Sequence, residues 1–257
     1  MNGLKRRPVL VTGAASGMGR ATCERLAAEG AAVALVDRNA TELAAVADAL
    51  SRHGARAVPI VADVSREADV RGAIERAIND LGGLRGLVTC AGIFNPGDFT
   101  LLADVSLETF VDTLGVNLVG TFLCAKYALP HLLRGVGEGA SPAIVTIAST
   151  AALRGHGFGS GYTASKGGVV ALTRLLAFQY GPQGVRANCI CPGLTDTPMT
   201  GGAYNDPEKA RSVTRGIPLR RIAQPEEIAN LACYLLSDDA SYINGQTIAA
   251  DGGATVV

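Results

Sequence analysis

The 257-residue chain predicts an α/β fold, a single doubly wound domain in which helices cover both faces of a parallel sheet of about seven strands. Short apolar runs of strand length alternate with longer helical patterns along the whole chain. The strand runs are apolar throughout, which indicates that both faces of the sheet are covered. No linker, repeat or low-complexity tract divides residues 1–257, so we expect one domain.

Each expected strand is a short run of β-branched and aliphatic residues, and each expected helix is a longer patterned stretch that follows a strand. The expected strands cover residues 9–11, 33–36, 58–61, 87–89, 143–148, 185–190 and 246–250. The expected helices cover residues 17–29, 41–52, 67–81, 106–133, 162–180 and 225–236. Right-handed crossovers between parallel strands place helices on both sides of the sheet. We therefore expect a ligand crevice at the carboxyl ends of the strands, where the strand order reverses.

The composition excludes several classes of protein. Hydrophobic residues make up 48% of the chain and charged residues 18%, which is typical of a globular protein. The 23 basic residues balance the 23 acidic ones, so nothing in the charge favours nucleic acid or an anionic membrane as a partner. The basic triplet at residues 5–7 is interpreted as a solvated terminus. The apolar runs noted here are too short to span a bilayer, and no signal peptide is expected.

The six cysteines show no spacing typical of a metal site, and no metal is expected. We expect all of them to be buried, reduced thiols of a cytoplasmic protein. They are Cys23, Cys90, Cys124, Cys189, Cys191 and Cys233.

A glycine-rich turn joins the first expected strand to the first expected helix. Its glycines are Gly13, Gly17 and Gly19, with Ser16 and Met18 between them. Glycine allows a tight turn and a close approach of the backbone to a pyrophosphate, and the amino end of the following helix attracts that charge. The spacing is not the common G-x-G-x-x-G, but its position in the fold predicts a Rossmann-like nucleotide site.

Asp37 stands at the end of the second expected strand, 18 residues after Gly19. A carboxylate here accepts hydrogen bonds from both hydroxyls of an adenosine ribose and repels a 2′-phosphate, so NAD is favoured over NADP. Arg38 is the contrary feature, because a neighbouring arginine can serve that phosphate. The alternative reading of Asp37 is a turn-forming residue after a strand.

With these features the chain resembles the short-chain dehydrogenase/reductase family, in its branch of about 250 residues, over essentially its whole length. The motifs that carry the resemblance are the glycine loop at 12–19, Asp63 and Val64, the segment 90–92, Asn117, Ser149, the Tyr-x-x-x-Lys at 162–166, Pro192 with Gly193, and Thr197. Their common order, each at an expected strand end or on an expected helix, makes the resemblance specific.

The resemblance implies a role for each motif in holding the cofactor. Asp63 is expected to hold the adenine amino group, with Val64 beside the ring, and Thr197 to hold the nicotinamide carboxamide together with the backbone of Leu194. The full expected set is Gly13, Ser16, Gly17, Met18, Gly19, Asp37, Arg38, Asp63, Val64, Cys90, Ala91, Gly92, Tyr162, Lys166, Pro192, Gly193, Leu194, Thr195 and Thr197. Where the family usually has Asn-Asn-Ala-Gly, this chain has Cys90 in place of the second Asn, which puts the bracing of the sheet in doubt.

Alcohol oxidation needs a base for the hydroxyl proton and a hydride acceptor. Tyr162 and Lys166 are four residues apart on one helix face, and a nearby ammonium favours a phenolate over a phenol whose ordinary pKa is about 10. Ser149 is expected to hold the substrate oxygen. By resemblance, Asn117 binds a water that links Lys166 to solvent. These four residues are the expected catalytic set of an NAD-dependent oxidoreductase that transfers a hydride between nicotinamide and a secondary alcohol or ketone, with Tyr162 as acid/base.

Substrate contacts are expected from Ser149, His156, Tyr162 and Met199, and from a loop region over residues 194–216 whose glycines suit a lid. The partner is a small-molecule alcohol or ketone, and the apolar surroundings favour a cyclic or apolar one. Small residues on the expected helix 162–180 permit close packing, and relatives assemble through it, so a homotetramer is expected.

Three alternatives remain open at this point. A non-catalytic NAD-binding regulatory protein would keep the glycine loop and Asp37 but lose part of the catalytic set, which is complete here. A sugar epimerase or dehydratase usually has a longer carboxyl-terminal region. An enoyl-thioester reductase typically has six residues between its Tyr and Lys, whereas three intervene between Tyr162 and Lys166.

Overall fold

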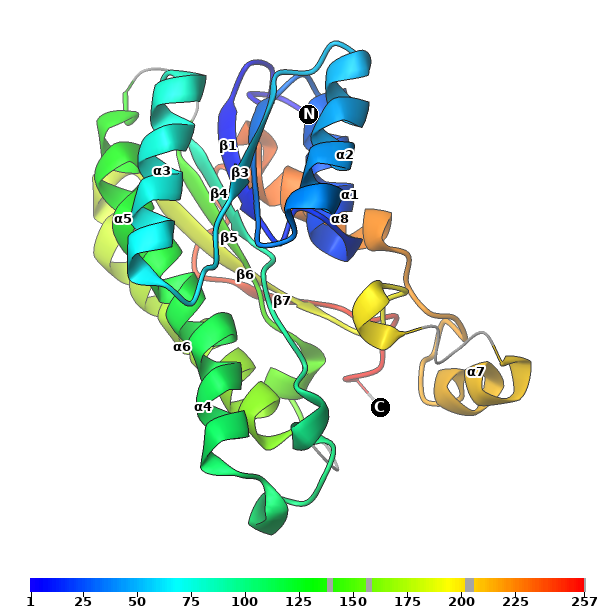
Figure 1. Ribbon diagram of the computed structural model, residues 1–257. Helices are drawn as coiled ribbons and strands as arrows, with labels where there is room; N and C mark the ends of the chain where they lie inside the picture. Colours follow the sequence, from blue (N-terminus) through cyan, green and yellow to red (C-terminus); the bar gives the residue numbers. More distant parts are fainter. Residues whose placement is uncertain (138–140, 156–158, 202–205, 257) are drawn as a thin grey trace.

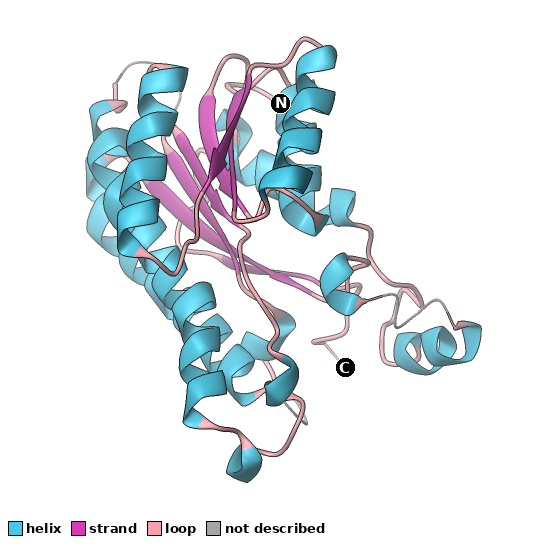
Figure 2. Cartoon of the chain, viewed as in Figure 1, coloured by secondary structure: helices cyan, strands magenta, loops and turns pink. Residues whose placement is uncertain are grey.

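A computed structural model of the chain describes residues 1–137, 141–155, 159–201 and 206–256. Seven parallel strands form one sheet in the order β3-β2-β1-β4-β5-β6-β7, which confirms the predicted fold class (Figures 1 and 2). The strands are β1 (Pro8–Thr12), β2 (Ala32–Asp37), β3 (Ala57–Val61), β4 (Gly86–Thr89), β5 (Ala143–Ile147), β6 (Arg186–Pro192) and β7 (Thr247–Ala250).

Helices form a layer on each face of the sheet (Figure 1). Helices α1 (Gly17–Ala28), α2 (Ala40–Arg52) and α8 (Pro225–Leu236) cover one face, and α3 (Glu67–Leu81), α5 (Gly120–Arg134) and α6 (Ser160–Tyr180) cover the other. Helix α4 (Leu107–Leu114) extends the second layer beyond the sheet, and α7 (Pro207–Thr214) lies apart from both layers near the carboxyl ends of the strands (Figure 1).

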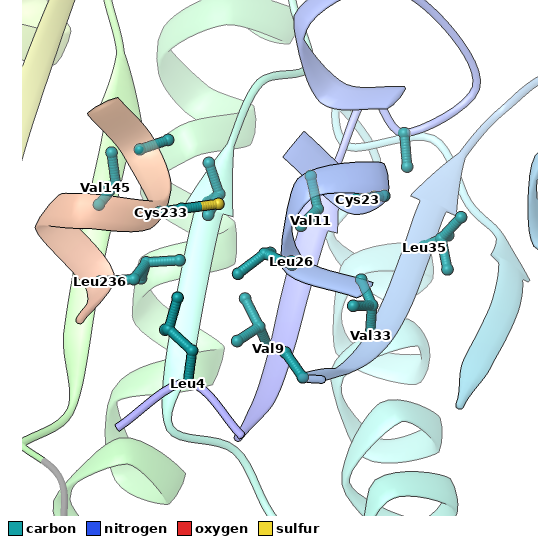
Figure 3. Packing of buried hydrophobic residues seen from close by; sticks show 14 of the residues in the cluster. Leu4, Val9, Val11, Cys23, Leu26, Val33, Leu35, Val145, Cys233 and Leu236 are labelled. Atoms are coloured by element: carbon teal, nitrogen blue, oxygen red, sulfur yellow. The ribbon is translucent and has the colours of Figure 1, made fainter. Parts of the chain in front are cut away.

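Alternate residues of the central strands fill the two cores, as the period of two in a strand requires. Val9 and Val11 of β1 pack toward Leu26 of α1 and Leu236 of α8 (Figure 3), whereas Leu10 joins the cluster under α3 and α5. Because both faces are buried, the strands read as continuous apolar runs in the sequence.

The strand order reverses between β1 and β4. The chain leaves β1 toward β2 and β3, then crosses back to place β4 on the other side of β1. The connections that follow β1 and β4 therefore diverge at their carboxyl ends, which is where open α/β sheets bind ligands.

The helix expected over residues 106–133 is not uniform. A π-helical turn, Gly115–Val119, separates α4 from α5, and buried Asn117 lies within it. The run Leu107–Arg134 also has the length and apolar composition of a membrane span, although none was expected. Its inner side packs on α3 and α6, as in a core helix. Helix α7 was not predicted at all, because it is short and its eight residues are mostly polar.

The interpretation of residues 5–7 as a solvated terminus is wrong for Arg7, which is 3% exposed. Its Nη2 donates to the carbonyl oxygen of Ser141 at 3.0 Å and to Oδ1 of Asp238 at 3.1 Å. Arg7 therefore joins the amino end of β1 to the segment after α8. An apolar run that starts at the next residue gave no sign of these distant partners.

Candidate active site

The glycine loop packs directly against the segment after β4. Gly13 has a φ of +68°, and a Cβ at this position would lie 2.8 Å from the backbone nitrogen of Ala91. A Cβ on Gly19 would lie 2.0 Å from the carbonyl oxygen of Gly13. Side chains are thus excluded at Gly13 and Gly19, and the first turn of α1 holds no acidic residue. The amino end of α1 is left open to an anion.

Asp37 connects β2 to this loop. Its Oδ2 accepts a hydrogen bond from the backbone nitrogen of Ala15 at 3.1 Å, and its Oδ1 accepts one from Asn39 at 2.9 Å. The carboxylate also lines the cavity beside the glycine loop. Asp37 therefore closes a turn, as the alternative reading held, and at the same time presents its charge to the cavity.

This cofactor-side cavity is bounded by the ends of four strands. Oδ1 of Asp63 accepts from the backbone nitrogen of Ser65 at 2.9 Å and from its Oγ at 2.7 Å, and the Ser65 hydroxyl is the chief cause that lowers the pKa of Asp63. Thirteen of the expected cofactor residues line this cavity: Gly13, Ser16, Gly17, Met18, Gly19, Asp37, Arg38, Asp63, Val64, Cys90, Ala91, Gly92 and Thr197. Val36, Ala62, Ile93, Val116 and Pro198 also line it, and no motif had marked them.

Cys90 occupies the position where the family usually has asparagine. It is half-buried, so the expectation that all six cysteines are buried is wrong for this one. Its thiol makes a hydrogen bond with Thr22 of α1, and burial raises its pKa to about 12. The thiol is therefore protonated, and it ties the end of β4 to α1. The neighbouring Ala91 nitrogen donates to Thr12 Oγ1 at 3.2 Å. These two contacts brace the sheet where the asparagine is missing.

A second, larger cavity of about 730 Å³ adjoins the first. Met18, Thr197 and Met199 line both, so the two cavities meet. The larger one is lined by Ser149 and Tyr162, by the expected cofactor residues Pro192, Gly193, Leu194 and Thr195, and by Thr200, Val213 and Gly216 of the expected loop region. Lys166, the last of the expected cofactor residues, lines neither cavity. His156, the other expected substrate residue, lies outside the described residues.

Tyr162 and Ser149 come together in the wall of the larger cavity. Ser149 follows β5 and begins a tight 3-10 turn, Thr150–Ala152, and Tyr162 is in the first turn of α6. Burial raises the pKa of Tyr162, and the hydrogen bond with Ser149 lowers it only in part. The ring of Phe94 packs on the ring of Tyr162 with centroids 5.0 Å apart. The two hydroxyls thus stand side by side, as a site for one oxygen atom requires.

Lys166 lies one turn further along α6, beneath the phenol ring. Its Nζ is 5.7 Å from the ring centroid of Tyr162 and donates to the carbonyl oxygen of Ile147 at 3.0 Å. Burial lowers the pKa of Lys166 to about 8. The sequence led us to expect that this ammonium lowers the pKa of Tyr162. The expectation is wrong for the protein alone, in which burial of the phenol raises this pKa.

Asn117 reaches the same place from the π-helical turn. Its Oδ1 accepts from the backbone nitrogen of Ile93 at 2.8 Å, and its Nδ2 donates to the Ile93 oxygen and to Ser165 Oγ, both at 3.0 Å. A Cβ on Gly92 would lie 3.2 Å from Asn117 Oδ1 and 3.3 Å from Lys166 Nζ. The fold therefore gathers Asn117 and Lys166 around Gly92, at the boundary of the cofactor-side cavity.

Sequence reasoning missed Asp98, which holds the amino end of α6. Asp98 is fully buried, and its carboxylate accepts from the backbone nitrogens of Gly161 at 3.1 Å and Tyr162 at 2.8 Å. Its own carbonyl oxygen accepts from Gly159 at 2.8 Å. The only signal in the sequence was an Asn-Pro-Gly-Asp stretch typical of a turn, which says nothing about a helix whose capped residues lie 63 and 64 positions away.

Comparison with known proteins places this geometry in a family. A family model described as enoyl-(acyl carrier protein) reductase matches residues 13–255. The chain is 38% identical to 2,5-dichloro-2,5-cyclohexadiene-1,4-diol dehydrogenase of Sphingobium indicum over 258 residues, which cover 100% of both chains. It is 40% identical to meso-2,3-butanediol dehydrogenase of Serratia marcescens over 248 residues, covering 96% of this chain and 94% of the relative.

A solved structure has the same fold throughout. This is the 3-ketoacyl-(acyl-carrier-protein) reductase from Brucella melitensis complexed with NADH, which has 32% identity and a TM-score of 0.91 and covers 98% of this chain and 99% of its own. The chain therefore belongs to the short-chain dehydrogenase/reductase family, as its motifs predict, and it is a nicotinamide-dependent oxidoreductase of alcohols and ketones.

Proposed function

We propose that the protein is an NAD-dependent dehydrogenase of a secondary alcohol, or reductase of the matching ketone, with Tyr162 as the general acid/base. The observation that carries the proposal is the placement of the Ser149 and Tyr162 hydroxyls in the wall of a cavity that adjoins the glycine-loop cavity. A substrate oxygen between these hydroxyls would have its carbon facing the nicotinamide end of the site. When bound, the nicotinamide accepts or supplies the hydride.

Each residue around the substrate oxygen has its own role in the reaction. Ser149 donates a hydrogen bond to the oxygen and stabilises the charge that develops there. Tyr162 takes the hydroxyl proton in oxidation and returns it in reduction. Because burial raises its pKa, Tyr162 needs positive charge beside it to serve as a base, and Lys166 supplies one such charge. Asn117 fixes Ile93 and Ser165 beside Lys166 and so holds the inner end of a proton route in place.

The residues of the smaller cavity fit a dinucleotide. A loop that admits no Cβ at Gly13 or Gly19 suits a pyrophosphate at the amino end of α1. The carboxylate of Asp37 suits the two hydroxyls of an adenosine ribose and opposes a 2′-phosphate, which favours NAD over NADP. Asp63 and Val64 would flank the adenine.

Carbonyl chemistry is favoured over reduction of an enoyl thioester. The matched family model bears the enoyl-reductase description, but both curated relatives are named as dehydrogenases of diols. One of these diols carries its hydroxyls on a six-membered ring. The apolar wall of the larger cavity, which includes Phe94, Leu194 and Ile217, suits a cyclic or apolar alcohol of that kind.

Substitution of Tyr162 by Phe tests the proposal. We expect turnover of any accepted alcohol to fall at least about 100-fold, because the proton acceptor is lost, while NADH binds as before. Tyr180→Phe, on the same helix, is the matched control and should leave both quantities unchanged. Substantial turnover by the Tyr162 variant would refute the assignment. The same assay with NADP in place of NAD tests the role of Asp37.

We expect the protein to form a homotetramer and to lie in the cytoplasm. Exposed apolar side chains lie along α4, α5 and α6 of the second helical layer, in which α4 packs on α6. They are Leu107, Val111, Phe122, Leu175 and Phe178. All six cysteines are free thiols, which suits a reducing compartment.

A further inference from the structure

One cation faces the larger cavity. Among the described residues that line it, Arg154 is the one charged side chain, and the rest of the wall is apolar or carries hydroxyl groups. A guanidinium beside an apolar cavity recognises a carboxylate through charge-assisted hydrogen bonds.

The backbone holds Arg154 close to the proposed catalytic hydroxyl. Ser149 begins the 3-10 turn, the backbone nitrogen of Ala152 donates to the Ser149 oxygen at 3.0 Å, and the nitrogen of Arg154 donates to the Thr150 oxygen at 3.2 Å. This compact turn places Ser149 and Arg154 on the same cavity wall. A single small ligand can then touch both.

The guanidinium retains unused donors. Its Nη1 donates to the carbonyl oxygen of Ala254 at 2.7 Å, which orients the group from the carboxyl-terminal side. The charge of Arg154 acts on the carboxylate of Asp251, but no ion pair joins the two among the described residues. Oδ1 of Asp251 accepts from Gly253, and its Oδ2 accepts from both the nitrogen and the hydroxyl of Thr255. Within the described ranges, the charge of Arg154 therefore has no bound counter-ion.

We propose that Arg154 binds a carboxylate of the substrate, so that the alcohol is a hydroxy acid whose hydroxyl lies between Ser149 and Tyr162. This inference deepens the proposed function and rests on it for the reacting end of the ligand. The part of the inference that concerns the carboxylate depends on Arg154 alone, and binding of a carboxylate can be measured without turnover.

Calorimetric titration of the NADH-saturated full chain with cyclohexanecarboxylate and with cyclohexanecarboxamide tests the proposal. The two ligands share shape and differ in charge. We expect the carboxylate to bind about tenfold to a hundredfold more tightly than the amide, and Arg154→Gln to abolish that preference. Arg174→Gln removes an exposed cation on α6 outside both cavities and should leave the preference intact.

Three results would overturn the inference: equal affinity of the wild type for the two ligands, no measurable binding of the carboxylate, or an equal fall in affinity for both ligands in Arg154→Gln. The last would show that Arg154 only supports the carboxyl-terminal segment through Ala254. Oxidation of 4-hydroxycyclohexanecarboxylate and of cyclohexanol in a parallel assay separates the two proposals. A protein that binds the carboxylate through Arg154 but oxidises neither alcohol upholds the carboxylate site and contradicts the proposed function.

Discussion

At the scale of single residues, Lys166 is a side chain whose charge state depends strongly on the fold. It is 5% exposed, and a buried ammonium with one carbonyl partner is less favourable than a hydrated one. Burial lowers its pKa to about 8, so it still carries its charge at neutral pH. The protein thus retains a cation under Tyr162 at a cost in stability.

That cost predicts a pH dependence of folding. The pKa of Lys166 is about 8 in the folded chain and about 10.5 in the unfolded one, so the unfolded chain binds more protons between these values. The free energy of unfolding should therefore rise with pH across this window. Relative to Lys166→Met, the free energy of unfolding of the wild type should increase by about 3 kcal/mol between pH 8 and 10.5. The cost of burying the charged ammonium is complete below about pH 8 and absent above about pH 10.5.

Urea unfolding of both proteins at the two ends of the window provides the measurement. Comparison with the variant cancels the titration of other groups, and Lys126→Met, which alters an exposed lysine, is the control. A difference between wild type and Lys166→Met that stays constant with pH would contradict the lowered pKa.

At the scale of elements, the amino end of α6 depends on a loop far away in sequence. The segment that follows β4 contributes Asp98 to cap α6 and Phe94 to pack on Tyr162. Phe94 also lines the larger cavity. Substrate contacts and the position of the phenol are therefore set by one connection.

Asp98→Ala should leave the backbone N–H groups of Gly161 and Tyr162 unpaired. We expect a loss of about 2 kcal/mol in stability and at least a tenfold fall in kcat, because a small displacement of an acid/base group is costly. The KM for NADH should not change. Asp98→Asn keeps one acceptor oxygen and should restore part of kcat. Ser106 caps α4 in a similar way, since its Oγ accepts a hydrogen bond from the backbone nitrogen of Thr109. As a control, Ser106→Ala should lower stability by about 1 kcal/mol without affecting kcat. An unchanged kcat in Asp98→Ala would show that the cap is only structural.

The same elements show what the sequence determines and what it leaves open. All seven strands were predictable to within about two residues, because a strand buried on both faces must be apolar along its length. The glycine loop was predictable because its backbone tolerates no Cβ at Gly13 or Gly19. The π-helical turn around Asn117 was not, since a local change of hydrogen bonding leaves the apolar pattern of the helix intact.

Contacts between segments distant in sequence were the second kind of feature that the sequence did not predict. Asp98 and Arg7 each act on partners more than 60 residues away, and neither belongs to a local pattern. The pKa of Tyr162 was predicted from its helical neighbour Lys166, but it depends on how deeply the phenol is buried. Burial by other segments is a property of the folded chain and cannot be read from spacing on one helix.

At the scale of the whole molecule, the second helical layer presents an apolar outer surface. Phe178 of α6 is 83% exposed and Leu107 of α4 is 77% exposed, and both helices lie on the side of the sheet away from α1 and α8 (Figure 1). Exposed apolar side chains on adjacent helices are typical of a subunit interface. Small residues of α6, including Ala164 and Ala171, allow another helix to approach closely.

Substitution of Phe178 by Asp should therefore disrupt the assembly. Size-exclusion chromatography with light scattering should give four times the chain mass of 26.3 kDa for the wild type and a smaller species for Phe178→Asp, because a carboxylate would be buried without a partner. Val61→Asp, on the edge strand β3 at the far end of the sheet, introduces the same charge at an exposed valine and should remain tetrameric. A wild-type monomer would contradict the proposed assembly, and a tetrameric Phe178→Asp would exclude the outer side of α6 from the interface.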